Sequence, residues 1–227
     1  METNSRRRTL VIAALAACLI VAGIGGVLAW LTVSNSVTNT FTIGNISQPT
    51  TDPDTPGTTV TLAGNISENK WVDNAKIVPG TSVPKNPNIG IGKGSDDSYA
   101  YAFVKNNVAT DAYFTLNANW QPVSYGGTGS AKAYGSVSNA YTGGLFMYVG
   151  PSGSTATPLT ASPTADVWTG ELFSTVTMPA SANADSYTGA SGAYTMDVSC
   201  YLATSAGTST SDLNTAAQAW ADGLATS

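Results

Sequence analysis

Apolar side chains recur at every second position in several segments of this chain, and short stretches rich in Gly, Ser, Pro and Asn separate those segments. A period of two is that of a β-strand with one buried face and one solvated face. The segment 194–202 shows it plainly, with apolar side chains at Tyr194, Met196, Val198, Cys200 and Leu202. Many such strands joined by polar turns predict an all-β fold, an antiparallel jelly-roll-like β-sandwich.

Five further segments carry strand signals, and a short helix is expected at the C-terminal end. The predicted strands are 58–62, 99–105, 113–120, 145–149 and 172–178. Asp212 is the predicted N-cap of the helix, whose single apolar stripe consists of Leu213, Ala216, Ala217, Trp220 and Leu224. Packing against the core is the favoured interpretation of this stripe, and a surface for a partner is the alternative.

The longest alternating segment lies near the N-terminus. Its apolar positions are Leu31, Val33, Val37, Phe41 and Ile43, while Asn35 and Asn39 share their parity and only Ser and Thr occupy the other. This pattern predicts an amphipathic strand. The segment 48–57 then holds three prolines and is predicted to be a linker. We therefore divide the chain into a leader (1–29), an N-terminal strand (30–47), a linker (48–57) and a β-sandwich domain (58–227).

The leader has the features of a secretory signal peptide. Three arginines, at positions 6 to 8, precede an apolar run, and Val27-Leu28-Ala29 predicts cleavage between Ala29 and Trp30. The mature protein is then secreted, to the cell surface or an extracellular matrix. An uncleaved leader would instead anchor the chain in a membrane. A second alternative is a lipobox ending at Cys18, which would be lipidated.

Cysteine usage allows no internal disulfide once the leader is removed, because Cys200 is then the only cysteine. Its place on the apolar face of the segment 194–202 predicts a buried and inert thiol. The stability of the domain must then come from packing.

The residue types also exclude several classes of function. The chain has no histidine, which excludes His-containing zinc sites and Ser-His-Asp or Cys-His catalysis. The formal net charge is −5, and removal of Glu2 and the three leader arginines, a net +2, leaves −7. The remaining six lysines are scattered and no arginine is left, so nucleic acid and direct binding to an anionic membrane are disfavoured.

We expect no catalytic, cofactor or metal site. The carboxylates show no spacing that identifies a general acid and a general base, so an exported hydrolase is a minor alternative; those considered are Glu68, Asp73, Asp111, Asp166 and Glu171. Asp52, Asp54 and the pair Asp96-Asp97 could offer oxygens to calcium. Because they lack the spacing of a calcium-binding loop, we interpret them as solvated turn residues.

Several segments resemble the TasA and camelysin family of Firmicutes, exported proteins with a SipW-type signal peptide. They are Leu28 to Thr32, Thr38 to Asn45, Lys76 to Gly80 with Lys85-Asn86-Pro87, Asp97 to Tyr101, and Ala216 to Trp220. The resemblance implies a jelly roll that polymerises into Gram-positive biofilm matrix fibres, with the N-terminal strand of one subunit completing a sheet of the next. The segment 124–144, rich in Gly, Ser and Tyr, does not fit the family pattern and is interpreted as a specialised surface loop.

We therefore expect a structural fibre subunit whose partners are further copies of itself, other matrix proteins and a signal peptidase. The five apolar positions between residues 31 and 43 are the expected assembly residues. In such donor-strand complementation, backbone hydrogen bonds give affinity and pockets take alternate side chains, and head-to-tail repetition gives a filament. The alternatives are a monomeric surface adhesin or binding module whose N-terminal strand closes its own sandwich, and an ordinary first strand with no role in assembly.

Overall fold

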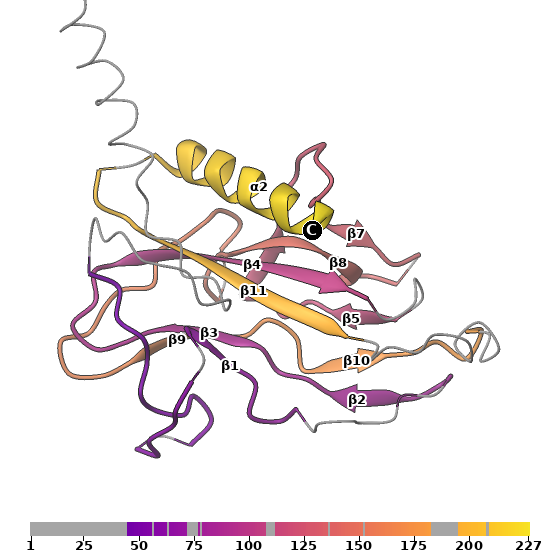
Figure 1. The fold of residues 1–227 in the computed structure, drawn as a ribbon, viewed down its shortest axis with the longest axis horizontal. Coiled ribbons are helices and arrows are strands. Elements are labelled where there is room, and N and C mark those ends of the chain that lie inside the picture. Colours follow the sequence, from indigo (N-terminus) through magenta and orange to yellow (C-terminus); the bar gives the residue numbers. More distant parts are fainter. Residues whose placement is uncertain are drawn as a thin grey trace, which may run out of the picture.

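The computed structural model describes residues 45–227, except residues 56, 63, 72–76, 78, 108–111, 136, 152, 183–194 and 208. The predicted leader, the cleavage site between Ala29 and Trp30, and the apolar positions from residue 31 to residue 43 lie outside the described residues. The described part is mostly antiparallel β-structure with one C-terminal helix (Figure 1). The all-β prediction, with a C-terminal helix, is confirmed.

Eleven strands and one helix follow one another along the described part of the chain. They are β1 (Ile66–Ser67), β2 (Ser82–Pro84), β3 (Asn88–Ile91), β4 (Ser98–Asn106), β5 (Tyr113–Thr115), β6 (Trp120–Pro122), β7 (Lys132–Ala133), β8 (Ala140–Tyr148), β9 (Val167–Glu171), β10 (Thr175–Thr177), β11 (Met196–Thr204) and α2 (Thr210–Thr226).

Four predicted strands differ from the observed ones by more than two residues. The segment 58–62 contributes only an isolated bridge between Thr59 and Thr51, and the segment 172–178 is shortened to β10. The segment 145–149 is the end of a longer strand, β8, which begins at Ala140. The segment 113–120 is split between β5 and β6, because the N–H of Trp120 donates to the carbonyl of Asn117 and closes a turn. Leu116 and Trp120 are buried in one core cluster, whereas Ala118 in the turn is exposed.

The strands form one curled eight-stranded sheet and one three-stranded sheet. The larger has the order β11-β4-β8-β5-β10-β2, with β6 and β7 also paired to β8, and the smaller has the order β1-β3-β9. One half of β8 pairs with β5 and β7, and the other half with β4 and β6. Gly144 lies at the change of partners with φ 115°. A Cβ there would lie 2.4 Å from the Cα of Ala131, so this position requires glycine.

The core has two parts, which lie on the two faces of β4. Ala100, Ala102 and Val104 face the main cluster inside the curled sheet, whereas Tyr101 and Phe103 face a second cluster beneath α2. The helix covers the outer face of the sheet (Figure 1), where its buried residues, Leu213, Ala217 and Ala221, are spaced four apart. Core packing is therefore the confirmed interpretation of the helix stripe.

The N-cap of α2 is Ser209, so the prediction of Asp212 is wrong by about one turn. The N–H of Asp212 donates to Ser209 Oγ at 3.2 Å, and that hydroxyl donates to Asp212 Oδ2 at 2.7 Å. The serine and the acid three residues later thus act together at the helix start, as in a capping box. The negative charge of Asp212 in this first turn also interacts favourably with the positive end of the helix dipole.

Candidate functional site: an open strand edge

The strand β11 is the terminal strand of the eight-stranded sheet, and its pairing shows which of its backbone groups face outward. The N–H of Asn107 donates to Thr195 O, and the N–H of Ser205 donates to Asp97 O. In the same register, residues of odd number between them form the hydrogen-bonded pairs with β4. The N–H and C=O groups of Met196, Val198 and Leu202 therefore point to the other edge, where no described strand is paired with β11.

This open edge belongs to a strand that is otherwise part of the core. Its inward side chains pack in the main cluster, and Cys200 and Leu202 are 1% and 0% exposed. A nine-residue edge strand of this kind is unusual, because natural edge strands are commonly short, charged or covered. The open edge of β11 is therefore the feature of the described fold best suited to receive another strand.

Cys200 lies on the inward face of this strand, as the alternation predicts. Its thiol is buried and forms no disulfide among the described residues, and burial raises its pKa to about 12. The thiolate fraction at neutral pH is therefore very small, and the thiol is inert. The interpretation of Cys200 as a core cysteine is confirmed.

The chain reaches the described domain beside the C-terminal end of β11. The N–H of Asn45 donates to Asp96 Oδ2 at 2.8 Å, and the N–H of Asp96 donates to Asn45 O. The next residue, Asp97, accepts the N–H of Ser205 just beyond β11. Asn45 therefore lies close to the point where β11 ends.

The segment predicted to be a linker is bonded to the body of the domain. Asp166 Oδ2 accepts the N–H groups of Thr50 and Thr51 at 2.7 and 2.8 Å, and Asp166 Oδ1 accepts the N–H of Lys93. Burial alone would raise the pKa of Asp166, but these hydrogen bonds outweigh burial and lower it. The domain boundary at this segment stays a prediction. The described residues of the segment are held against the domain by these hydrogen bonds.

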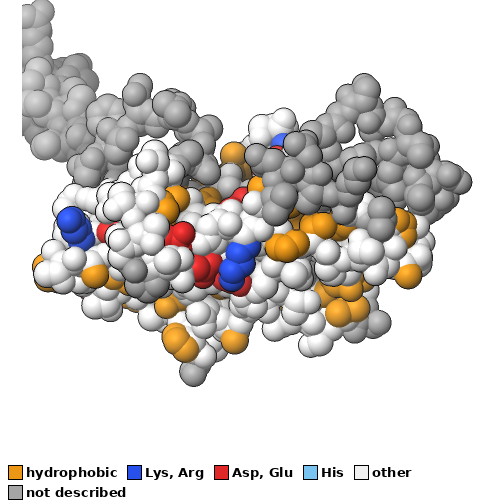
Figure 2. Space-filling view, turned by 90° about the horizontal axis from the view of Figure 1, so that it is seen from below, with side chains coloured by type: hydrophobic (Ala, Val, Ile, Leu, Met, Phe, Trp, Pro, Cys, Tyr) orange, Lys and Arg blue, Asp and Glu red, His pale blue; other side chains and the backbone are white. Residues whose placement is uncertain are grey.

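A polar cluster holds the acidic end of the same segment. Asn86 is fully buried, and its Nδ2 donates to Asn69 Oδ1 at 2.8 Å and to Asp54 Oδ2 at 3.1 Å. Lys70 forms ion pairs with Asp54 and Glu171. Acidic and basic side chains gather near the middle of the face drawn in Figure 2. The N-terminal segment is thus attached to the three-stranded sheet through side chains as well as backbone.

Three of the five carboxylates considered for hydrolysis are described, and each is engaged elsewhere. Glu68 pairs with Lys85, and Asp166 binds backbone N–H groups. Burial would raise the pKa of Glu171, but hydrogen bonds from Lys70, Ser174 and Asn86 lower it, which does not suit a general acid. Asp73 and Asp111 lie outside the described residues, and among those described no three His, Cys, Asp or Glu side chains could hold a metal ion.

Two of the four acids considered for calcium, Asp96 and Asp97, act as acceptors for backbone N–H groups. Asp96 binds Asn45, and Asp97 Oδ1 accepts the N–H of Ala161 at 2.7 Å. These bonds fasten loops to the start of β4, which is a structural role. In the part of the chain that the structure covers, no helix has the length and apolar character to cross a membrane.

Fold and open edge together define an all-β protein with a C-terminal helix and a long edge strand left open. Comparison with family models, with curated proteins and with solved structures finds no match. The resemblance to the TasA and camelysin family therefore stays a prediction. The functional argument has to be made from the residues of this chain.

Proposed function

We propose that this protein is a secreted structural subunit that assembles head to tail, with the N-terminal strand of one copy adding to β11 of the next. The observation that carries the proposal is the open edge of β11. The backbone groups on that edge have no described partner strand, while the inward side chains Met196, Cys200 and Leu202 are buried. The incoming strand supplies Leu31, Val33, Val37, Phe41 and Ile43 on one face. Strand addition needs both of these parts: backbone groups to pair and apolar side chains for the core.

The point where the chain leaves the domain favours exchange between copies over closure within one copy. A strand that ends near Asn45 and lies along its own β11 would run parallel to it, because both end at the same place. A strand from another copy can run antiparallel to β11. Antiparallel pairing is slightly more stable per residue. A copy-to-copy contact of this kind, repeated without closure, produces a filament.

Electron microscopy of two matched chains tests the proposal. One begins at Trp30, and the other begins at Asn45 and so keeps the contacts with Asp96 and Asp166. We expect filaments from the longer chain alone. Filaments from both chains, or monomers from both, would contradict strand exchange.

A point substitution refines the experiment. Phe41→Asp places a charge on the apolar face of the strand and should abolish filaments, whereas Thr40→Asp places the same charge on the polar face and should leave them intact. A synthetic peptide of residues 30–43 should bind the chain that begins at Asn45 and cap it as a monomer. If both substitutions have the same effect, alternate apolar side chains do not carry the contact.

The second candidate is a monomeric surface adhesin or binding module that closes its sheet with its own strand. It is favoured by the same open edge, which requires a covering strand but not one from another copy. In that case the chain from Trp30 stays monomeric by light scattering and unfolds at a higher temperature than the chain from Asn45. An exported hydrolase has no support from the described carboxylates.

A further inference from the structure

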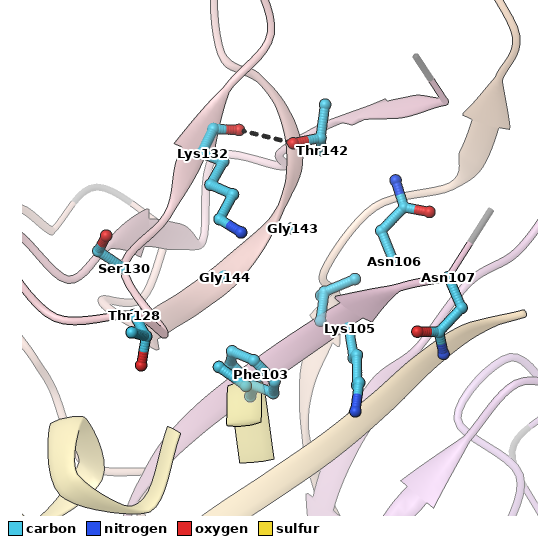
Figure 3. Close-up of a pocket in the computed structure, with 12 residues that line it drawn as sticks. Phe103, Lys105, Asn106, Asn107, Thr128, Ser130, Lys132, Thr142, Gly143 and Gly144 are labelled. Atoms are coloured by element: carbon cyan, nitrogen blue, oxygen red, sulfur yellow. Dashed lines mark hydrogen bonds between the residues drawn. The ribbon is translucent and has the colours of Figure 1, made fainter. Parts of the chain in front are cut away.

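A polar cavity of about 350 Å³ lies where β8 changes partners (Figure 3). The end of β4, the loop before β7, β7 itself and the last turn of α2 form its wall. Gly143 and Gly144 contribute backbone to this wall but no side chain. The volume is within the range of small-molecule sites in proteins.

The wall of this cavity is positively charged within an acidic protein. Lys105 and Lys132 line it, and no acidic residue does. Among the described residues, neither ammonium group has a carboxylate within 4.0 Å, since every ion pair there involves Lys70 or Lys85. Lys132 extends from β7 toward Gly143 (Figure 3). Two uncompensated ammonium groups at one cavity favour an anionic ligand.

The carboxylate of Asp197, directly across the sheet from Lys105, already accepts hydrogen bonds from other residues. Asp197 is the cross-strand partner of Lys105, but its Oδ2 accepts hydrogen bonds from Asn107 Nδ2 at 2.9 Å and from Thr195 Oγ1 at 3.0 Å. The carboxylate is thus bonded to neutral donors on β11 and its flank. It forms no ion pair with Lys105 within 4.0 Å.

The remaining polar groups of the wall suit a ligand that also carries hydroxyl groups. Thr128 and Thr142 donate their hydroxyl protons to Asp222 and to the carbonyl of Lys132, which leaves oxygen lone pairs as acceptors. Ser130 has no side-chain hydrogen bond within the described structure and can donate or accept. A sulfate ion offers no proton to such acceptors at neutral pH, whereas the hydroxyl groups of a sugar do.

The C-terminal end of α2, which also lines the cavity, favours hydroxyl groups of a ligand as well. Ala225 lines the cavity in the last turn of the helix. Helix C-termini carry a partial negative charge and carbonyl acceptors. They attract hydroxyl donors and repel anions, so an anionic group is expected beside the lysines and neutral hydroxyl groups beside the helix.

From this arrangement we propose that the cavity binds a carboxylate-bearing sugar, a uronate unit of an acidic polysaccharide. The Lys132 ammonium contacts the carboxylate, Lys105 adds positive charge to the wall, and the hydroxyl oxygens and helix carbonyls accept protons from the sugar hydroxyls. The site lies on β4, β7, β8 and α2, so it is independent of the N-terminal strand. A matrix protein with this site would bind acidic polymer along its length.

Calorimetry on the chain that begins at Trp30 tests this assignment with three probes. These are an alginate tetrasaccharide, the neutral maltotetraose and inorganic sulfate. We expect the alginate tetrasaccharide to bind at least about tenfold more tightly than either of the others, because it alone combines charge with hydroxyl groups. Equal binding of sulfate, or no binding of alginate, would overturn the proposal.

Two substitutions that each remove one positive charge test whether the cavity is the binding site. Lys132→Gln should weaken alginate binding about tenfold, whereas Lys93→Gln, at an exposed lysine outside the cavity, should change it less than about twofold. Equal loss in both variants would mean general attraction to a polyanion and would contradict a defined cavity. Thermal unfolding of each variant shows whether its fold is retained.

A third variant tests the hydroxyl part of the assignment. Thr142→Val keeps the β-branched shape that suits a strand and removes one acceptor. It should weaken alginate binding while leaving the lysines in place. If its affinity equals that of the unchanged chain while Lys132→Gln binds weakly, the cavity recognises charge alone, and the sugar assignment is wrong. Phe41→Asp should bind alginate normally, which separates this site from fibre assembly.

Discussion

Asp222 on α2 accepts the backbone N–H of Gly129 at 2.7 Å, and so joins the C-terminal helix to a loop 93 residues earlier in the chain. The hydroxyl groups of Tyr125 and Thr128 donate to the same carboxylate. Three donors from one loop thus converge on a single oxygen of the helix. The segment 124–144 is therefore tied into the fold at this point, and its last residues begin β8.

This carboxylate predicts a contribution to stability that depends on pH. The hydrogen bond from Gly129, together with those from Tyr125 and Thr128, lowers the pKa of Asp222 below its ordinary value of 3.8, although desolvation opposes this shift. A carboxyl whose pKa is lower in the folded state stabilises the fold above the unfolded pKa, and that contribution is lost as the pH falls through the folded pKa. Asp222→Asn should lower the melting temperature at pH 7 and have little effect near pH 2.

Differential scanning calorimetry of both chains at the two pH values measures this difference. Asp212→Asn is a useful comparison, because Asp212 lies in the first turn of the same helix and contacts only Ser209. A loss of stability for Asp222→Asn that is the same at pH 2 as at pH 7 would show that the carboxylate charge is not the cause.

The glycines of the same loop differ in the space around them, which gives a second prediction. A Cβ at Gly129 would lie 2.7 Å from the backbone carbon of Ala221, whereas a Cβ at Gly126 would meet nothing within 4 Å. Gly129→Ala must displace α2 or the loop and should destabilise the protein by about 1–3 kcal/mol. Gly126→Ala should be neutral within about 0.5 kcal/mol. Urea unfolding measures the free energy of unfolding of both variants. Equal losses in the two variants would contradict the close approach of Gly129 to Ala221.

The sequence predicted the class of fold well, because alternation is a local property of each strand. It predicted β4 and β11 within one or two residues. It failed for residues 113–120, where a turn interrupts the strand and leaves Ala118 exposed between the buried Leu116 and Trp120. It also missed the start of β8, because the glycines and polar residues of positions 140–144 hide a strand that bends between two sets of partners.

Only one of the two parts of the candidate site could be predicted from the sequence. The alternating pattern of residues 31–43, which predicts an amphipathic strand, is visible in the sequence. The strand that could receive it is not, since an edge position follows from the order of strands. The attachment of residues 50 and 51 to Asp166 was hidden as well, because these residues are 116 and 115 positions from it in the chain. Three prolines in that segment suggested only a linker.

The attachment at Asp166 gives a third prediction. Asp166→Asn removes the charge that holds the N–H groups of Thr50, Thr51 and Lys93. Hydrogen exchange of these three amides should accelerate, while amides of the central strand β4 should exchange as before. If the three amides keep their protection in the variant, the segment is held by other contacts and Asp166 is not its anchor.

The ion pair of Lys85 and Glu68 leads to the fourth prediction. The ammonium group lies 2.8 Å from Glu68 Oε2 and 4.8 Å from the ring centroid of Trp71, and the Lys85 side chain is 6% exposed. Glu68 Oε1 is buried and has no hydrogen-bond partner in the described structure, so Glu68 depends on this lysine for compensation. Lys85→Met should therefore cost about 3 kcal/mol of unfolding free energy, the scale seen when one partner of a buried pair is removed.

Much of that loss is the cost of a buried carboxylate left alone, and a double substitution separates the two terms. Glu68→Leu together with Lys85→Met removes both charges, and its loss should be clearly smaller than that of Lys85→Met alone. Lys70→Met is the control, because the Lys70 side chain is 51% exposed and its ion pairs should be worth less than about 1 kcal/mol. If the double variant is less stable than Lys85→Met, Glu68 contributes stability that does not depend on Lys85, and the loss in Lys85→Met is not the cost of leaving Glu68 without its partner.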